Sequence, residues 1–108
     1  PATLNQLFDF FYDDENEKEY TFRNALLRVL VFTYFNFEEK EQKLILDFFL
    51  KNLKESNDSE LIFSLLSQFY SLNLMNNDFK SALLDLEKKY SGNWRIAKMI
   101  FQILDLKP

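Results

Sequence analysis

The chain has 108 residues, 47% of them hydrophobic and 13 of them Phe, which is enough apolar material for one domain with its own core. A single Gly and two terminal Pro leave few residues that shape tight turns between strands, so we expect an all-α fold. Acidic residues outnumber basic ones 17 to 13, and Cys and His are absent, which argues against nucleic-acid binding, disulfides and thiolate or imidazole metal sites.

Two helices are predicted in the first third of the chain. Apolar residues recur every three or four positions over about residues 4–12, which predicts the first helix. Residues 13–17 then form a polar, acidic connection. The second predicted helix, about residues 20–35, is apolar on nearly all sides and includes Phe32. A helix of that kind belongs in the middle of a bundle, and we expect it there.

The third and fourth predicted helices each follow a capping pattern. Asn36 is followed three residues later by Glu39, which predicts an N-cap and a helix that reaches about Leu53. Asn57 is followed in the same way by Glu60, and a helix over about residues 60–72 comes next.

Two further helices complete the predicted bundle. Residues 76–78 are expected to cap a fifth helix, which ends near Gly92, a residue suited to a left-handed closing position. The last helix carries its apolar residues at Trp94, Ala97, Ile100, Phe101 and Leu104. The pattern therefore predicts a compact bundle of about six short helices, with residues 1–108 as one domain.

The acidic connection is the natural place to look for a metal ion. Without His or Cys, only oxygen ligands remain, and these favour calcium or magnesium. A calcium-binding loop counted from Asp13 would need Gly at its sixth position and Glu at its twelfth, where this chain has Lys18 and Asn24. We therefore predict a solvated loop and no metal, with a divalent-cation module as the hypothesis to be tested against this.

No catalytic machinery is evident in the sequence. The chain has no Gly-rich phosphate loop, no Ser-centred nucleophile motif and no Glu-x-x-His pattern, and its acids occupy helix caps or lie beside lysines. We predict that the protein is not an enzyme and binds no cofactor.

The aromatic residues mostly keep helical spacing, which is typical of core packing. Five of them lie off the main stripe of their helix or at its end: Phe10, Tyr12, Tyr34, Phe37 and Tyr70. These are candidates for a partner-binding groove or a homodimer face, because exposed aromatic patches mark interaction sites.

Trp94 and Arg95 open the last helix. One interpretation is a Trp that covers the end of the bundle beside a solvated Arg. The other is a partner contact, because Trp and Arg are enriched among the residues that dominate binding energy at interfaces.

Two stretches of the chain show a likeness to a known family. The first is Leu26-Leu27-Arg28-Val29-Leu30-Val31-Phe32 followed by Glu38-Glu39-Lys40-Glu41; the second joins the Phe79-led helix to the apolar helix carrying Met99 and Phe101. Together they resemble the TerB-like domain of DjlA-type, membrane-tethered DnaJ-like co-chaperones. The resemblance covers about three quarters of the chain.

This resemblance implies a TerB-like fold and a regulatory or interaction role in an Hsp70 co-chaperone. The family usually has Ala-Asp-Gly between its paired helices, where this chain has Tyr34-Phe35-Asn36-Phe37, so a metal role is not carried over. There is no His-Pro-Asp loop in the chain, so any contact with Hsp70 is expected through a domain outside it.

The expected setting is the cytoplasm, with a possible inner-membrane tether outside a chain that looks excised from a longer protein. Arg28, Thr33 and Asn36 interrupt the richest apolar stretch, so no direct membrane insertion is expected. The alternative function is a small acidic helical binding protein, such as a secretion chaperone or an immunity protein.

Overall fold

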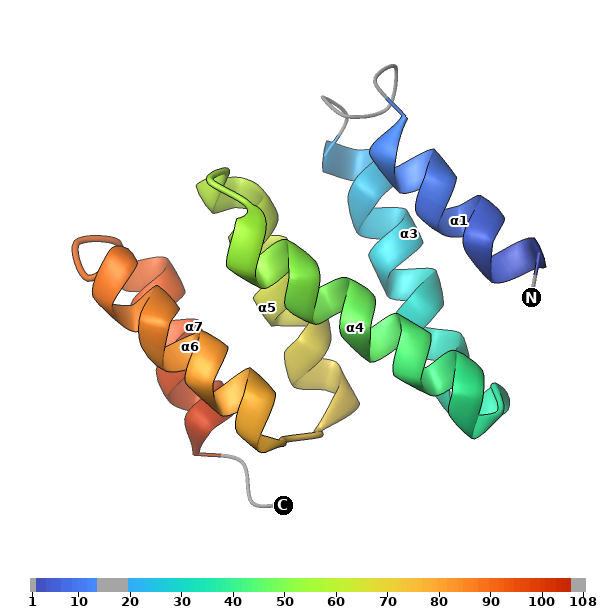
Figure 1. The fold of residues 1–108 in the computed structure, drawn as a ribbon. Coiled ribbons are helices and arrows are strands. Elements are labelled where there is room, and N and C mark those ends of the chain that lie inside the picture. The colour runs from blue at the N-terminus through green and yellow to red at the C-terminus, as the bar shows by residue number, and fades with distance from the viewer. Residues whose placement is uncertain (1, 14–19, 106–108) are drawn as a thin grey trace. The chain divides into compact units, whose positions relative to one another are not determined.

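A computed structural model describes residues 2–13 and 20–105 of the chain (Figure 1). Those residues form six α-helices and one short 3-10 helix, with no strand among them, which confirms the all-α prediction. Contacts divide the chain into two compact units, residues 1–45 and 46–108, and the division falls within α4 (Glu39–Glu55). The prediction of a single domain stays a prediction.

The first unit pairs α1 (Ala2–Tyr12) with α3 (Tyr20–Thr33) (Figure 1). Each helix buries one apolar face, and the fully or nearly fully buried residues include Leu4 and Phe11 of α1 and Leu26, Leu27 and Leu30 of α3. The guanidinium of Arg23 lies 5.0 Å from the centre of the Phe11 ring, so even the buried charge of α3 packs against an aromatic face.

The expectation that the second helix is enclosed on all sides was wrong. Val29 is about half exposed, and Phe32 is 83% exposed. The buried residues of α3 keep to one stripe, and the apolar residues beyond that stripe face solvent. Helix α3, whose sequence is apolar on nearly all sides, therefore buries only one of its faces.

A 3-10 helix, η1 (Tyr34–Asn36), separates α3 from α4. The Tyr34 carbonyl accepts hydrogen bonds from the Phe37 amide at 3.2 Å and from Nε2 of Gln42 at 3.1 Å. The Glu38 carbonyl accepts the first amide bond of α4, from Gln42 at 2.9 Å. Asn36 ends η1, so the predicted N-cap was two residues too early.

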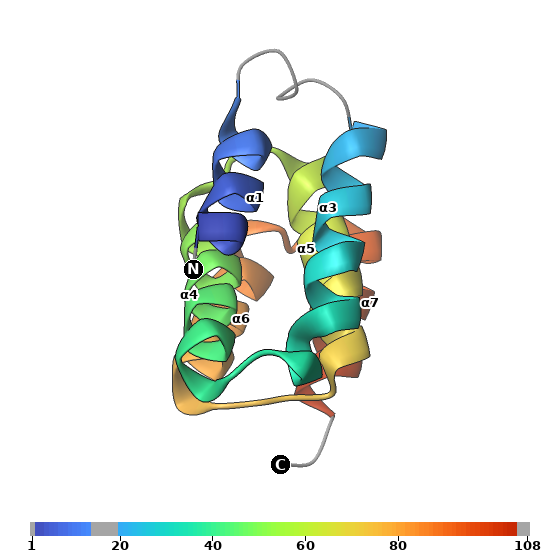
Figure 2. The same cartoon turned by 90° about the vertical axis from the view of Figure 1, so that its right-hand side faces the viewer.

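In the second unit, α5 (Ser59–Leu72) and α6 (Asn77–Lys89) both contact α7 (Trp94–Leu104) (Figure 2). Three Phe rings join α4, α5 and α6. Phe69 stacks on Phe79 with ring centres 4.2 Å apart, and its centre lies 6.4 Å from that of Phe49. All three side chains are buried, as their helical spacing predicts.

In this unit, α5, α6 and α7 each begin with a side-chain N-cap. Asp58 accepts from the amides of Glu60 and Leu61, at 3.0 and 3.4 Å. Asn76 accepts from the Phe79 amide at 2.9 Å, and Asn93 caps α7 in the same way. The Asn76 cap confirms the prediction, whereas the cap of α5 is one residue later than Asn57.

The predicted left-handed Gly was also wrong. Gly92 has no positive φ, and α6 ends at Lys89 with Tyr90 as its C-cap. Among the described residues, the left-handed position belongs to Asn73, at φ 54°, which closes α5. Asn tolerates this conformation better than other residues with a Cβ, because its short polar side chain can bond locally.

None of the helices in residues 2–13 and 20–105 combines the length and the apolar content that a membrane span requires.

Candidate interaction surface

Helix α7 has a buried apolar stripe and an exposed stripe that carries two aromatic side chains. Its buried stripe consists of Ile96, Ile100 and Ile103, which follow i, i+4, i+7 spacing and are almost fully enclosed. The second stripe consists of Trp94, Lys98 and Phe101 at the same spacing and faces solvent, with Trp94 70% exposed and Phe101 71% exposed. Core packing explains the first stripe and leaves the second without a role in the fold.

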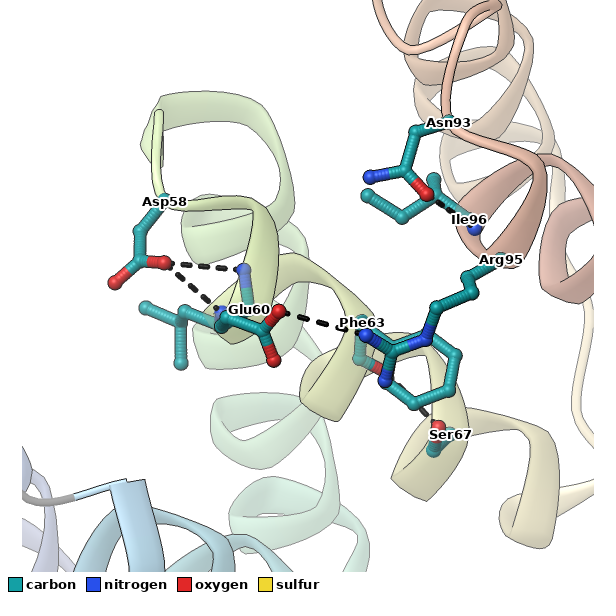
Figure 3. Close-up of polar contacts among 8 residues, drawn as sticks. Asp58, Glu60, Phe63, Ser67, Asn93, Arg95 and Ile96 are labelled. Atoms are coloured by element: carbon teal, nitrogen blue, oxygen red, sulfur yellow. Dashed lines mark hydrogen bonds and ion pairs between the residues drawn. The ribbon is translucent and has the colours of Figure 1, made fainter.

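Arg95 connects the start of α7 to α5 (Figure 3). Its guanidinium lies 4.2 Å from the centre of the Phe63 ring, and its Nη1 is 3.5 Å from Oε1 of Glu60. Both charged side chains are more than half exposed, so solvent screens this ion pair and its contribution to stability is small. The stack on Phe63 therefore does more than Glu60 to orient Arg95.

A shallow depression of about 300 Å³ lies between α5 and α7 beside Arg95. Its lining residues are Phe63, Trp94, Arg95, Lys98, Met99 and Gln102. Together with Phe101, we name these residues the Trp94 surface. It contains aromatic rings, a Met and an Arg, which are residue types enriched at protein–protein interfaces, together with a Lys.

The charge of the Trp94 surface differs from that of the whole chain, which is −4. Arg95 and Lys98 are the charged residues of α7, and Nζ of Lys98 lies 5.5 Å from the centre of the Trp94 ring. Glu60 lies at one end of the surface, and Asp105 follows α7 at the other. The surface is therefore locally positive along its middle.

Two of the residues predicted to bind a partner, Trp94 and Arg95, are brought together here. Tyr70 is partly exposed on α5 but does not line this depression. The interpretation of Trp94 as a lid over the bundle end is inconsistent with its exposure, because most of the indole remains in solvent.

The other predicted residues belong to the first unit, and they differ in exposure. Phe10 and Tyr12 of α1 are about half exposed, and Phe10 lines a very open depression with Asp9 and Asp13. Tyr34 is buried, which raises the pKa of its phenol, so it cannot contribute to an exposed surface. Phe37 is half-buried.

Five residues of the Trp94 surface were not predicted from the sequence to bind a partner: Phe63, Lys98, Met99, Phe101 and Gln102. Phe101 was grouped with its neighbour Ile100 among the apolar residues of the last helix. The spacing of Trp94, Lys98 and Phe101 is itself a helical stripe, and the Lys in its middle is the signal that this stripe faces solvent.

Among the residues whose placement is described, no three Asp or Glu side chains lie close enough to hold a metal ion. The acidic connection proposed as a cation site falls mainly on residues 14–17, outside the described residues. The cation hypothesis is therefore untested at that connection.

Comparison of the chain with protein-family models, with curated proteins and with solved structures found no match in any of the three.

Proposed function

We propose that this protein is a non-catalytic interaction module that binds another protein through the Trp94 surface. The observation that carries the proposal is the second stripe of α7, where two large aromatic side chains about 70% exposed share one helix face. Isolated exposed apolar residues are common, but here two large ones share a helix face and one of them lines a depression, which favours a partner site.

The energy available at Trp94 supports this role. A Trp side chain buries on the order of 200 Å² when it is enclosed, and most of that area is still open here. Covering it would contribute about 3 kcal/mol at about 25 cal/mol per Å². A contribution of that size is characteristic of a residue that dominates an interface.

The resemblance to TerB-like domains suggests where such a module operates. We propose that the domain is the regulatory or interaction region of a DnaJ-like co-chaperone, with the Hsp70 contact made by a J domain elsewhere in the protein. Peptide mass mapping of the native parent protein tests this placement. A His-Pro-Asp loop in flanking sequence would support it, and a native protein without a J domain would leave the secretion-chaperone or immunity-protein alternative.

Site-specific photo-crosslinking in the native host tests the interaction itself. A photoreactive phenylalanine analogue replaces Phe101, and in a matched control it replaces Phe32, an equally aromatic and even more exposed position on α3. We expect a discrete adduct from position 101 that is lost when Trp94→Ala is added, and no such adduct from position 32. Adducts at both positions, or adducts that persist in the Trp94→Ala variant, would refute the assignment of this surface.

A further inference from the structure

We propose that the partner segment is an amphipathic helix whose apolar stripe is flanked by carboxylates, and that one of these carboxylates takes the place of Glu60 on Arg95. This inference deepens the proposed function and rests on it. Three features of the Trp94 surface carry it: the shape of the exposed stripe, the charges beside it and the weak internal ion pair at its edge.

The shape of the exposed stripe matches a helix. Trp94 and Phe101 are seven residues apart on α7, which corresponds to about 10 Å along the axis. A partner helix presents apolar side chains with the same i, i+3/i+4, i+7 periodicity. The shallow depression beside Met99 offers a place for one of these side chains.

The charges select an acidic helix. Arg95 and Lys98 border the apolar stripe, each beside an aromatic ring, and the Glu60 carboxylate near Arg95 is more than half exposed to solvent. A partner rich in Lys or Arg would meet like charge along the middle of the surface, while a partner with carboxylates would find charge-assisted donors. Asp105 follows the C-terminal end of α7 and would repel a carboxylate there. The carboxylates of the partner are therefore expected over Arg95 and Lys98.

Glu60 is an internal stand-in for such a carboxylate. It meets Arg95 at 3.5 Å, the outer range of a charge-assisted hydrogen bond, and both side chains remain largely solvated. The Phe63 ring and the chain of α7 already hold the guanidinium in position. Arg95 can therefore exchange one carboxylate for another with little rearrangement, and removing Glu60 takes away a competitor.

The test uses Trp94 itself as the reporter, because it is the only Trp in the chain. Three Trp-free peptides of about 16 residues are titrated into the full chain. One carries a Leu stripe flanked by Glu, the second carries the same stripe flanked by Lys, and the third keeps Glu but has Ser in place of Leu. The measurement is the shift of the Trp94 emission to shorter wavelength, supported by anisotropy of labelled peptide.

We expect binding of the Leu/Glu peptide, at least about fivefold weaker binding of the Leu/Lys peptide, and no shift with the Ser/Glu peptide. Glu60→Gln should tighten binding of the Leu/Glu peptide by about two- to fivefold, and Arg95→Gln and Lys98→Gln should each weaken it by a similar factor. Lys80→Gln, at an exposed position on α6, is the matched charge control and should change nothing. Thermal melts check that each variant is folded.

Equal binding of the Leu/Glu and Leu/Lys peptides would overturn the acidic-helix inference and leave the interaction function standing. Unchanged affinity in the Glu60→Gln variant would overturn the exchange at Arg95. If neither Leu peptide shifts the Trp94 emission, the helical partner is refuted, while the crosslinking at position 101 still decides the proposed function independently.

Discussion

Two Phe residues of the same unit provide a direct test of which side chains belong to the core. Phe69 is 0% exposed and lies between Phe49 and Phe79, whereas Phe101 is 71% exposed. Replacing each by Ala makes the same chemical change at opposite degrees of burial. The difference between the two variants therefore measures burial and little else.

The expected magnitudes are far apart. Phe69→Ala removes a fully enclosed ring and leaves a cavity, which lowers the free energy of unfolding by about 3–5 kcal/mol, including the stack with Phe79. Phe101→Ala removes only the small covered part of the ring, which lowers the free energy of unfolding by about 0.5–1 kcal/mol. The higher helix propensity of Ala offsets about half of that loss. We expect Phe101→Ala to be nearly neutral.

Urea denaturation followed by far-UV circular dichroism and by Trp94 fluorescence gives both values. The measurement is repeated at several protein concentrations, so that any self-association through Phe101 is detected as a concentration-dependent midpoint. A loss of more than about 2 kcal/mol for Phe101→Ala would show that this ring is enclosed in solution. That result would contradict the exposure of the second stripe of α7, on which both functional proposals depend.

Three further changes test individual contacts, each by urea denaturation. Tyr90→Phe removes a buried hydroxyl that has no hydrogen-bond partner among the described residues, so the free energy of unfolding should stay constant or rise by up to about 1 kcal/mol; a clear loss would reveal a partner. Asp58→Ala removes the N-cap of α5 and should lower the free energy of unfolding by about 1 kcal/mol, whereas Asn57→Ala should lower it by less than about half of that. A larger loss for Asn57→Ala would show that Asn57 is the N-cap. Burial raises the pKa of Tyr34, so above about pH 10 the unfolded chain loses this proton before the folded chain does. Wild-type stability should therefore fall more steeply with rising pH than that of Tyr34→Phe, and parallel curves would contradict the burial.

The helices and most of the core could be predicted because they depend on local periodicity. Leu65 and Phe69 of α5, for example, keep the spacing that any buried helix face requires, and both are fully buried. The helix ends were less certain, because neighbouring residues compete to cap them. Asn57 and Asp58 are both good N-caps, and only the backbone geometry decides that Asp58 accepts the amide bonds.

The interaction surface could be predicted only in part. Trp94 and Arg95 stand out by residue type, but the choice of which apolar stripe of α7 faces the core depends on where α5 and α6 lie. Phe101 and Ile100 are adjacent in sequence and have opposite environments. Phe63 could not have been linked to Arg95 at all, because 32 residues separate them and only the packing of α5 on α7 brings them together.

The ordinary backbone conformation at Gly92 has a consequence for how this protein can change over evolution. Its φ is not positive, and an added Cβ would have no neighbour within 4 Å, so the turn does not need the special freedom of glycine. The Asn93 cap and the packing of α7 hold the turn instead. Position 92 lies two residues before Trp94, so the turn that leads into α7 can take a side chain without a steric clash at its Cβ.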